Sequence, residues 1–174
     1  MPFLRTAAAG QSIPMAQDID VLNILTDEAR IADWNTYGLP ADPVSSENGA
    51  VVMNTVRWPL LIDPQLQGVA WLKSMLSGEE GRKLQLTRLG TDSTLSTMAQ
   101  AIENGSSVVI ENMGERIDAV LMPIVQRAII TRSGRKYMQI GDSEIELNPQ
   151  FRLFMHTKMQ NPHYPPEIQA EVGD

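Results

Sequence analysis

The amino-acid sequence predicts an α/β fold with a mainly parallel sheet. Three short apolar runs, at residues 60–63, 107–112 and 151–158, are typical of strands buried on both faces. Helical patterns separate these runs, and such alternation favours parallel strands joined by right-handed crossovers. With 174 residues, 43% of them hydrophobic, the chain is long enough for one globular domain with its own core.

The composition argues against several classes of protein. The formal net charge is −7 and the 14 Lys and Arg residues are scattered, which disfavours a surface for nucleic acid or for an anionic membrane. No apolar stretch approaches the roughly 18 residues that cross a bilayer, so we expect a soluble protein without a membrane partner. The absence of cysteine excludes disulfides, thiolate catalysis and Cys-type metal sites, and it suits a reducing cytosolic setting.

The amino-terminal third is predicted to be mainly helical. Residues 1–17 show no sustained period and are interpreted as a tail or the remnant of a helix. A first short helix can begin at Asp18 or Asp20, and a second is expected to be capped by Thr26 and to end at Gly38.

A loop and a third helical pattern complete this region. Residues 39–46 are predicted to form the loop, after which Ser46 can cap residues 47–56 as a helix, although their β-branched content leaves a strand open.

The rest of the chain alternates in type. After the apolar run at 60–63, the expected elements are a helix over 68–76, a strand over 84–89, a helix over 91–104, a strand over 107–112, a helix over 118–128 in which Pro123 marks a restart or a first turn, a β-hairpin within 133–148 and a strand over 151–158.

The hairpin is predicted to turn at Gly141 and Asp142 and to protrude as an insertion before the last strand. Its alternation places two groups of side chains on opposite faces: Tyr137 and Gln139 on one, and Lys136, Met138 and Ile140, joined by Ile145 and Leu147, on the other.

The loop between the strand at 60–63 and the next helix has the position of a phosphate-binding loop. Such a loop follows the pattern G-x-x-x-x-G-K-[ST], in which glycines let backbone N–H groups wrap the phosphates, Lys holds the terminal phosphates and a hydroxyl binds Mg²⁺. Here Asp63, Gly68, Val69 and Ala70 occupy the four defining positions. Three of the four requirements fail, and Asp63 would repel phosphate, so the residues alone favour an ordinary strand-to-helix turn about as strongly as a degenerate pocket.

The strand at 107–112 ends where an ATPase carries an acidic pair. One acid holds Mg²⁺ and the second, a Glu, orients the attacking water. Here Glu111 is followed by Asn112, so the water-orienting position is an amide and hydrolysis should be crippled. Thr157 is the polar residue expected at the end of the following central strand. A capping role for Glu111 is favoured over a metal site.

The remaining conspicuous side chains have ordinary interpretations. The tryptophans at 34, 58 and 71 and the methionines are expected in the core. Asp142, Glu144 and Glu146 share one strand face, for which a solvated surface is favoured over a cation site, and no metal site is expected. His156 and His163 lack a partner at ligand spacing and are interpreted as surface or packing residues.

Several collinear segments resemble the dynein heavy chain. They are LPADPVSSENGAVV, RWPLLIDPQLQGVAWLK, VVIENMGERIDAVL, IGDSEIELNPQFRLFMHTK and NPHYPPE, and the likeness extends over residues 18–172. It is to the fifth AAA+ module of the motor ring, whose nucleotide pocket is degenerate in that family. The family loop reads DPQGQA, from which this chain departs, and the carboxyl-terminal segments are more similar to axonemal than to cytoplasmic dyneins.

The resemblance implies a three-layer P-loop NTPase-like AAA+ large subdomain over residues 18–174, with sheet order 5-1-4-3-2 and a hairpin inserted at about 133–148. The fifth strand belongs after residue 172 and is expected to be missing, as is the small subdomain that would follow it. The strand at 60–63 would then lie at an exposed edge, where self-association of the fragment or pairing with the N-terminal tail is expected.

The resemblance also implies a non-catalytic structural and relay module in a microtubule motor of the cytoskeleton, in a cilium or flagellum axoneme. Its partners would be the neighbouring modules and the linker of the same heavy chain, and microtubules through the whole motor. ATP and Mg²⁺ would bind to other modules, and no cofactor to this one. The alternative is a nucleotide-binding ATPase domain with a divergent loop. The degenerate pocket positions are Asp63, Pro64, Gln65, Gly68, Val69, Ala70, Glu111, Asn112 and Thr157.

Overall fold

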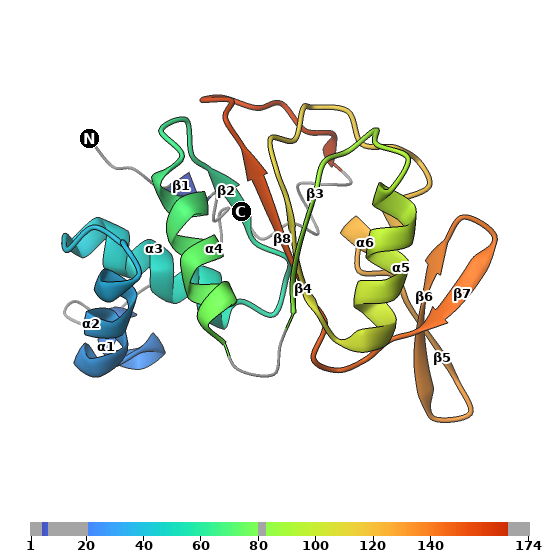
Figure 1. Ribbon diagram of the computed structural model, residues 1–174, viewed down its shortest axis with the longest axis horizontal. Coiled ribbons are helices and arrows are strands. Elements are labelled where there is room, and N and C mark those ends of the chain that lie inside the picture. Colours follow the sequence, from blue (N-terminus) through green and yellow to red (C-terminus); the bar gives the residue numbers. More distant parts are fainter. Residues whose placement is uncertain (1–4, 7–20, 80–82, 167–174) are drawn as a thin grey trace.

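A five-stranded sheet forms the centre of the molecule. The computed structural model describes residues 5–6, 21–79 and 83–166. The sheet has the order β1-β2-β8-β4-β3, with all neighbours parallel except β1 and β2 (Figure 1). Its strands are β1 (Arg5–Thr6), β2 (Leu60–Ile62), β8 (Arg152–Thr157), β4 (Ser107–Ile110) and β3 (Leu84–Thr87). The order β2-β8-β4-β3 matches the 1-4-3-2 part of the predicted sheet, so the predicted fold class is confirmed.

Helices and a second sheet cover the two faces of the main sheet. The helices are α1 (Val21–Leu25), α2 (Glu28–Thr36), α3 (Pro43–Asn54), α4 (Gln67–Gly78), α5 (Thr94–Asn104) and α6 (Met122–Val125). Alternate residues of β4 point to opposite sides: Val109 packs with residues of α2, α3 and α4, whereas Val108 and Ile110 pack with residues of α5, α6 and the second sheet. This alternation produces three layers, with one apolar core on each side of the sheet.

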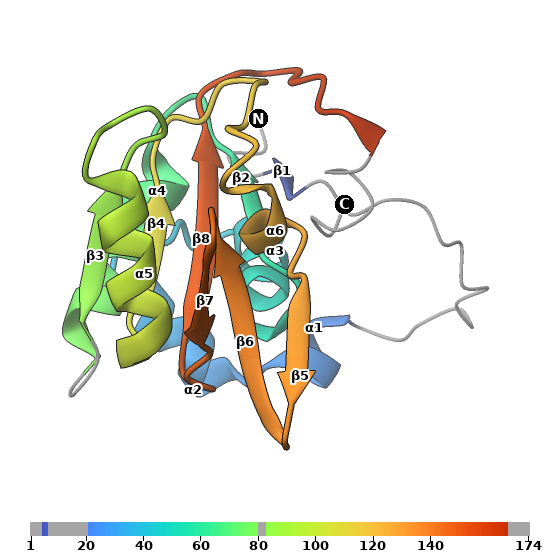
Figure 2. The same ribbon diagram turned by 90° about the vertical axis from the view of Figure 1, so that its right-hand side faces the viewer.

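The second sheet is antiparallel and has three strands, β5 (Ile129–Arg132), β6 (Arg135–Ile140) and β7 (Ser143–Glu146), as Figure 2 shows. The predicted hairpin around residues 141 and 142 is confirmed as β6 and β7. The sequence analysis missed β5. It joins β6 through a two-residue turn in which Ser133 and Gly134 have φ angles of 50° and 80°.

The predicted faces of this insertion are also confirmed. Met138 and Ile140 are buried in the core that includes α5 and α6, and Ile145 packs against the same core. Lys136 lies on the same face of β6, two residues from Met138, but its side chain is exposed. The row of core-facing side chains on β6 therefore has a cation, Lys136, at its amino-terminal end.

The beginnings of two helices differ from the prediction. The predicted cap Thr26 is wrong, because Asp27 caps α2 by accepting the Arg30 N–H at 2.8 Å. Helix α3 begins at Pro43 rather than after Ser46. Proline suits the first helical position because it lacks the N–H that would be unsatisfied there.

The cap of α3 explains its earlier start. The Asp42 carboxylate accepts from both the backbone N–H and the hydroxyl of Ser45, at 2.9 and 2.7 Å. These two hydrogen bonds lower the pKa of Asp42. The segment 47–56 is therefore mainly helical rather than a strand.

The helix predicted over 118–128 is much shorter than expected. Only α6 is α-helical, with Pro123 in its first turn as predicted. Turns precede it, and Arg127 has a φ of 50°, which ends the helical path.

The edge of the main sheet beside β2 is covered by the chain itself. Strand β1 pairs antiparallel with β2, Arg5 opposite Ile62 and Thr6 opposite Leu61. This pairing agrees with the expected alternative in which the N-terminal tail covers the edge, while self-association stays a prediction. Other residues of the segment 1–17 lie outside the described part of the chain.

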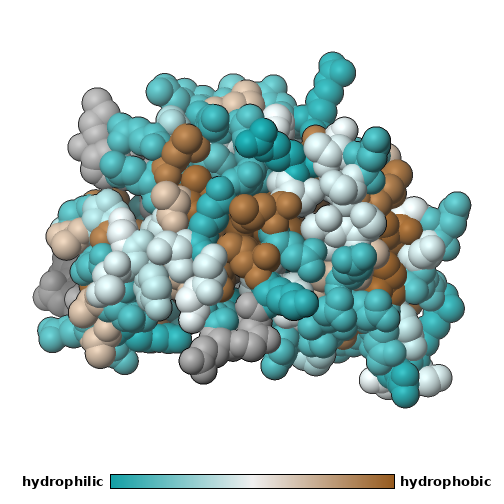
Figure 3. Space-filling model, viewed as in Figure 1, coloured by the Kyte–Doolittle hydropathy of each residue, from teal (hydrophilic) through white to brown (hydrophobic). Residues whose placement is uncertain are grey.

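Strand β3 forms the opposite edge. Apolar surface gathers between α4 and α5, where β3 lies (Figure 3), and Leu86 of this strand is 48% exposed.

No helix in the described ranges is both long and apolar enough to cross a membrane.

Candidate functional site: the strand ends around Asp63

The predicted pocket residues lie together at the end of the main sheet that is formed by the carboxyl ends of its parallel strands. Asp63 follows β2, Glu111 follows β4, and Thr157 ends β8, the strand between them. The backbone N–H of Asp63 donates to the Thr157 carbonyl at 3.0 Å, which joins two of these ends directly. Ligands of open α/β sheets bind beyond the carboxyl ends of the strands.

The Asp63 carboxylate lies at the amino end of α4. Its side chain is fully buried. Oδ1 accepts the backbone N–H of Gln67 at 3.1 Å, and Oδ2 accepts that of Val69 at 2.9 Å. The first N–H groups of a helix have no partner within the helix and carry partial positive charge, which is why phosphate binds there in nucleotide-binding proteins. In this chain an internal anion already uses two of these donors.

The other exposed residues of this loop carry no charged side chain. Leu66 is in the left-handed conformation, with φ 62°, and precedes α4 without a capping side chain. Pro64 and Gln65 are exposed, as is Ala70 on α4.

Gly68 and Val69 are buried instead. The Val69 side chain belongs to the core that contains Trp71 and Leu72, so the position where a phosphate-binding loop carries its lysine faces the interior.

Glu111 is held by two cations. Its carboxylate forms an ion pair with Lys73 of α4, and Arg88 lies 3.8 Å away. The side chain of Glu111 is 19% exposed, so these charges are only partly screened by water. The ion pairs satisfy a carboxylate that an active ATPase would use for Mg²⁺.

The hydroxyl of Thr157 is occupied within the chain. It donates to the carbonyl of Met113 at 2.7 Å and accepts the N–H of Met159 at 3.2 Å. Thr157 is fully buried, so it ties the end of β8 to the loop after β4 instead of projecting into a pocket.

Asn112 adopts φ 53° and its side chain is exposed. Its backbone N–H donates to Nδ1 of His156 at 3.1 Å. Because Nδ1 accepts a hydrogen bond, the proton of the neutral imidazole is on Nε2.

His156 is the buried centre of this cluster. Its side chain is 2% exposed, and Nε2 lies 3.9 Å from Oδ2 of Asp63. Burial lowers the pKa of His156, and the nearby carboxylates of Asp63 and Glu111 only partly oppose this effect. The imidazole is therefore neutral at pH 7 and packs against the loop.

The structure thus brings together Asp63, Glu111 and Thr157, and it adds two residues that the sequence analysis did not place there, Lys73 and His156. A usable signal for Lys73 was its position four residues after Val69, on the same side of α4. His156 was interpreted as a surface or packing residue, and it is indeed packed.

The other candidate residues lie elsewhere. Glu144 and Glu146 form ion pairs with Arg132 and Arg135, and His163 is exposed. Within the described residues, no three His, Cys, Asp or Glu side chains are grouped as a metal site requires. All three tryptophans are buried in the cores, as predicted.

Comparisons with known proteins agree with this architecture. Residues 32–173 match the family model described as the ATP-binding dynein motor region. The chain is 51% identical over 161 residues, 92% of its length, to the dynein alpha chain, flagellar outer arm, of Chlamydomonas reinhardtii. It is 47% identical over 172 residues, 99% of its length, to the dynein beta chain, ciliary, of Heliocidaris crassispina. Over 159 residues, 91% of its length, it is 47% identical to dynein axonemal heavy chain 17 of Homo sapiens. It spans 3% to 4% of the length of these relatives.

Proposed function

Because the chain belongs to the family of the ATP-binding dynein motor region, we propose that it is the fifth AAA+ module of an axonemal dynein heavy chain and serves as a non-catalytic relay element. Two arguments support the module number: the sequence resemblance described above and the failed phosphate-binding pattern at residues 63–70. The names of the relatives, flagellar, ciliary and axonemal dyneins, support a place in a cilium or flagellum.

The observation that carries the non-catalytic part is the position of the Asp63 carboxylate. A nucleotide phosphate at the amino end of α4 would have to displace Asp63 from the N–H groups of Gln67 and Val69. The displaced carboxylate would then lie close to the phosphate and repel it. No lysine is available at position 69 to offset this repulsion, because that residue is a buried valine.

The second support is that each part of the hydrolytic machinery is used for internal contacts. Glu111 pairs with Lys73, the hydroxyl of Thr157 bonds to Met113, and the position after Glu111 is Asn112. Such contacts make the strand ends rigid. A rigid module can transmit displacements between its neighbours in the motor ring, and the proposed partners are those neighbouring modules and the linker, with microtubules contacted through the whole motor.

Titration calorimetry with Mg-ATP and with Mg-ADP tests the non-catalytic proposal. We expect no binding heat at millimolar nucleotide for the chain, whereas a lysine-containing P-loop ATPase measured under the same conditions gives a saturable signal. Micromolar affinity for this chain would instead support the alternative, a nucleotide-binding ATPase domain with a divergent loop.

The relay role is tested in the complete heavy chain. Replacing Asp63 with Ala there should loosen the α4 end and reduce microtubule-stimulated ATPase activity and gliding velocity, although the other modules are unaltered. Unchanged motility with a demonstrably destabilised module would contradict the relay role.

A further inference from the structure

A cavity of about 480 Å³ lies between the main body and the second sheet. Trp58, which precedes β2, and Phe151, which precedes β8, form its inner wall, and Ile129, Lys136 and Leu147 close it from the side of the second sheet. It lies beyond the amino ends of the parallel strands, at the end of the main sheet opposite Asp63. The status of the nucleotide loop therefore has no bearing on what this cavity binds.

The inner wall is rigid. Trp58 is buried, its Nε1 donates to the carbonyl of Ile124 at 2.8 Å, and its ring meets that of Phe151 edge-on with centroids 5.4 Å apart. The hydrogen bond and the ring contact hold the indole in place, so that it provides a fixed apolar surface.

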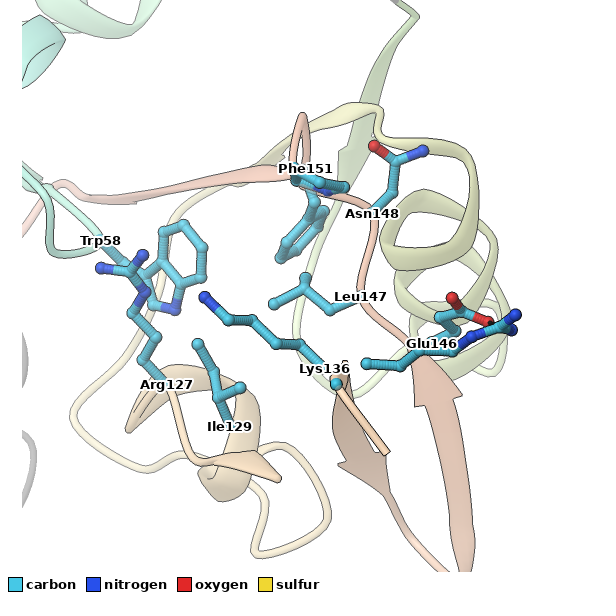
Figure 4. A pocket seen from close by; sticks show the side chains of 11 residues that line it. Trp58, Arg127, Ile129, Lys136, Glu146, Leu147, Asn148 and Phe151 are labelled. Atoms are coloured by element: carbon cyan, nitrogen blue, oxygen red, sulfur yellow. Dashed lines mark hydrogen bonds and ion pairs between the residues drawn. The ribbon is translucent and has the colours of Figure 1, made fainter. Parts of the chain in front are cut away.

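Two cations converge on this wall. The guanidinium of Arg127 lies 5.0 Å from the Trp58 ring centroid, and Lys136 extends into the cavity toward Trp58 (Figure 4). Lys136 lies on the core face of β6, where a hydrophobic residue would continue the pattern of Met138 and Ile140. Among the residues that the structure describes, Arg127 and Lys136 form no ion pair with a carboxylate.

Other cations near the cavity, in contrast, are paired with carboxylates. The nearby Arg135 is paired with Glu146, and Arg152 with Glu79. Arg127 and Lys136 keep their positive charge uncompensated although the chain as a whole has a net charge of −7. A carboxylate entering the cavity would find two donors over an apolar wall, where charged hydrogen bonds are stronger than in open water.

The shape favours a polypeptide over a compact anion. A second hollow, of about 210 Å³, shares Trp58, Arg127 and Phe151 with the first, so the two hollows adjoin at these side chains and are together called the groove. Val56, 76% exposed, lines the second hollow but not the first. Beside the first hollow, β5 is an edge strand of its sheet, and such an edge can pair with an extended chain.

We propose that this groove binds an extended acidic peptide segment of a protein partner. A carboxylate of the segment contacts Arg127 and Lys136, and an adjacent apolar side chain packs against Phe151 and Leu147. The segment runs along β5 toward Val56.

Fluorescence anisotropy with two rhodamine-labelled peptides, DEIEDI and its amide counterpart NQINQI, tests this proposal on the 174-residue chain. We expect DEIEDI to bind about tenfold or more tightly than NQINQI, the difference made by charged hydrogen bonds. Lys136→Gln and Arg127→Gln should each weaken DEIEDI binding by about tenfold. The matched control is Arg30→Gln, which removes the same charge from an exposed residue of α2 that lines neither hollow, and its affinity should stay within about twofold of wild type.

Equal binding of the two peptides, or an unchanged affinity of Lys136→Gln for DEIEDI, would overturn the proposal. So would a competition experiment in which inorganic phosphate displaces labelled DEIEDI as effectively as unlabelled DEIEDI does, because that result would indicate a site for small anions. If Arg127→Gln unfolds because it loses its stacking on Trp58, Lys136→Gln still decides, since that side chain is exposed.

Discussion

Nε2 of His156 lies 3.9 Å from Oδ2 of Asp63, and both side chains are buried. The same Oδ2 accepts the N–H of Val69, while Nδ1 of the imidazole accepts the N–H of Asn112. This buried pair therefore connects the loop after β2 with the loop after β4. Because burial keeps His156 neutral, the pair contributes to stability in a pH-dependent way.

We expect the free energy of unfolding to fall on acidification because of His156. Its folded pKa is lower than the unfolded value of 6.5, so below that value the unfolded chain binds a proton that the folded chain does not. The stability is complete well above pH 6.5 and is lost as the pH falls toward the folded pKa. Between about pH 7.5 and 5.5 the loss reaches at most about 1.4 kcal/mol.

Urea denaturation of wild type and of His156→Asn measures this contribution. The Asn oxygen can replace Nδ1 as acceptor but does not titrate in this range. The difference in stability between the two proteins should therefore shrink or reverse on acidification, and parallel pH profiles would contradict the assignment.

Asp63→Ala should destabilise the protein by about 3 kcal/mol, because it leaves two N–H groups at the amino end of α4 without their acceptor. Asp63→Asn keeps one acceptor oxygen and should cost about 1 kcal/mol. Chemical denaturation gives both values. Asp27→Ala, which removes the exposed cap of α2, is the matched control and should have a smaller effect than Asp63→Ala.

Val69→Lys alone should not produce ATPase activity. The single charge leaves Asp63 at the helix end, Ala70 without a hydroxyl and Asn112 in place of the water-orienting acid. It also places an ammonium where a 5% exposed valine packs, so the melting temperature should fall. Phosphate release above the wild-type background would overturn the account of this pocket.

Gly105→Ala should cost more stability than Gly90→Ala. Both glycines have positive φ, at 73° and 80°, but a Cβ at 105 would lie 2.6 Å from Oδ1 of Asn148, whereas a Cβ at 90 meets nothing within 4 Å. The backbone penalty of about 1 kcal/mol is common to both variants. Thermal unfolding of the pair thus isolates the contact between the end of α5 and Asn148, and equal losses would show that Asn148 moves aside freely.

Removal of residues 1–6 should uncover the edge of β2. The strand pairs of β1 with Leu61 and Ile62 are lost, and an unpaired strand edge promotes association between chains. Sedimentation velocity should show a larger concentration-dependent dimer fraction for the truncated chain than for the full chain. A truncated chain that stays monomeric at the same concentrations would contradict this expectation.

Local patterns were sufficient for most of the architecture. The buried strands β2, β4 and β8 and the amphipathic helices α4 and α5 were predictable because continuous apolar runs and helical spacing reflect burial directly. The identities of the residues at 63, 69 and 112 likewise predicted a poor phosphate site, since a missing charge or hydroxyl is visible without coordinates. The short strands β1 and β5 were missed because each is held by pairing with another strand and has little pattern of its own.

What the Asp63 carboxylate does was decided only by the tertiary structure. The sequence determined that an acid would stand beside the amino end of a helix, and it predicts that this acid disfavours phosphate. The bend at Leu66, with its φ of 62°, places that acid on the N–H groups of α4, and β8 brings His156 against it. Likewise, Lys73 meets Glu111 because α4 packs beside the end of β4, 38 positions along the chain. Such contacts depend on how the layers pack, and no short-range pattern in the sequence encodes them.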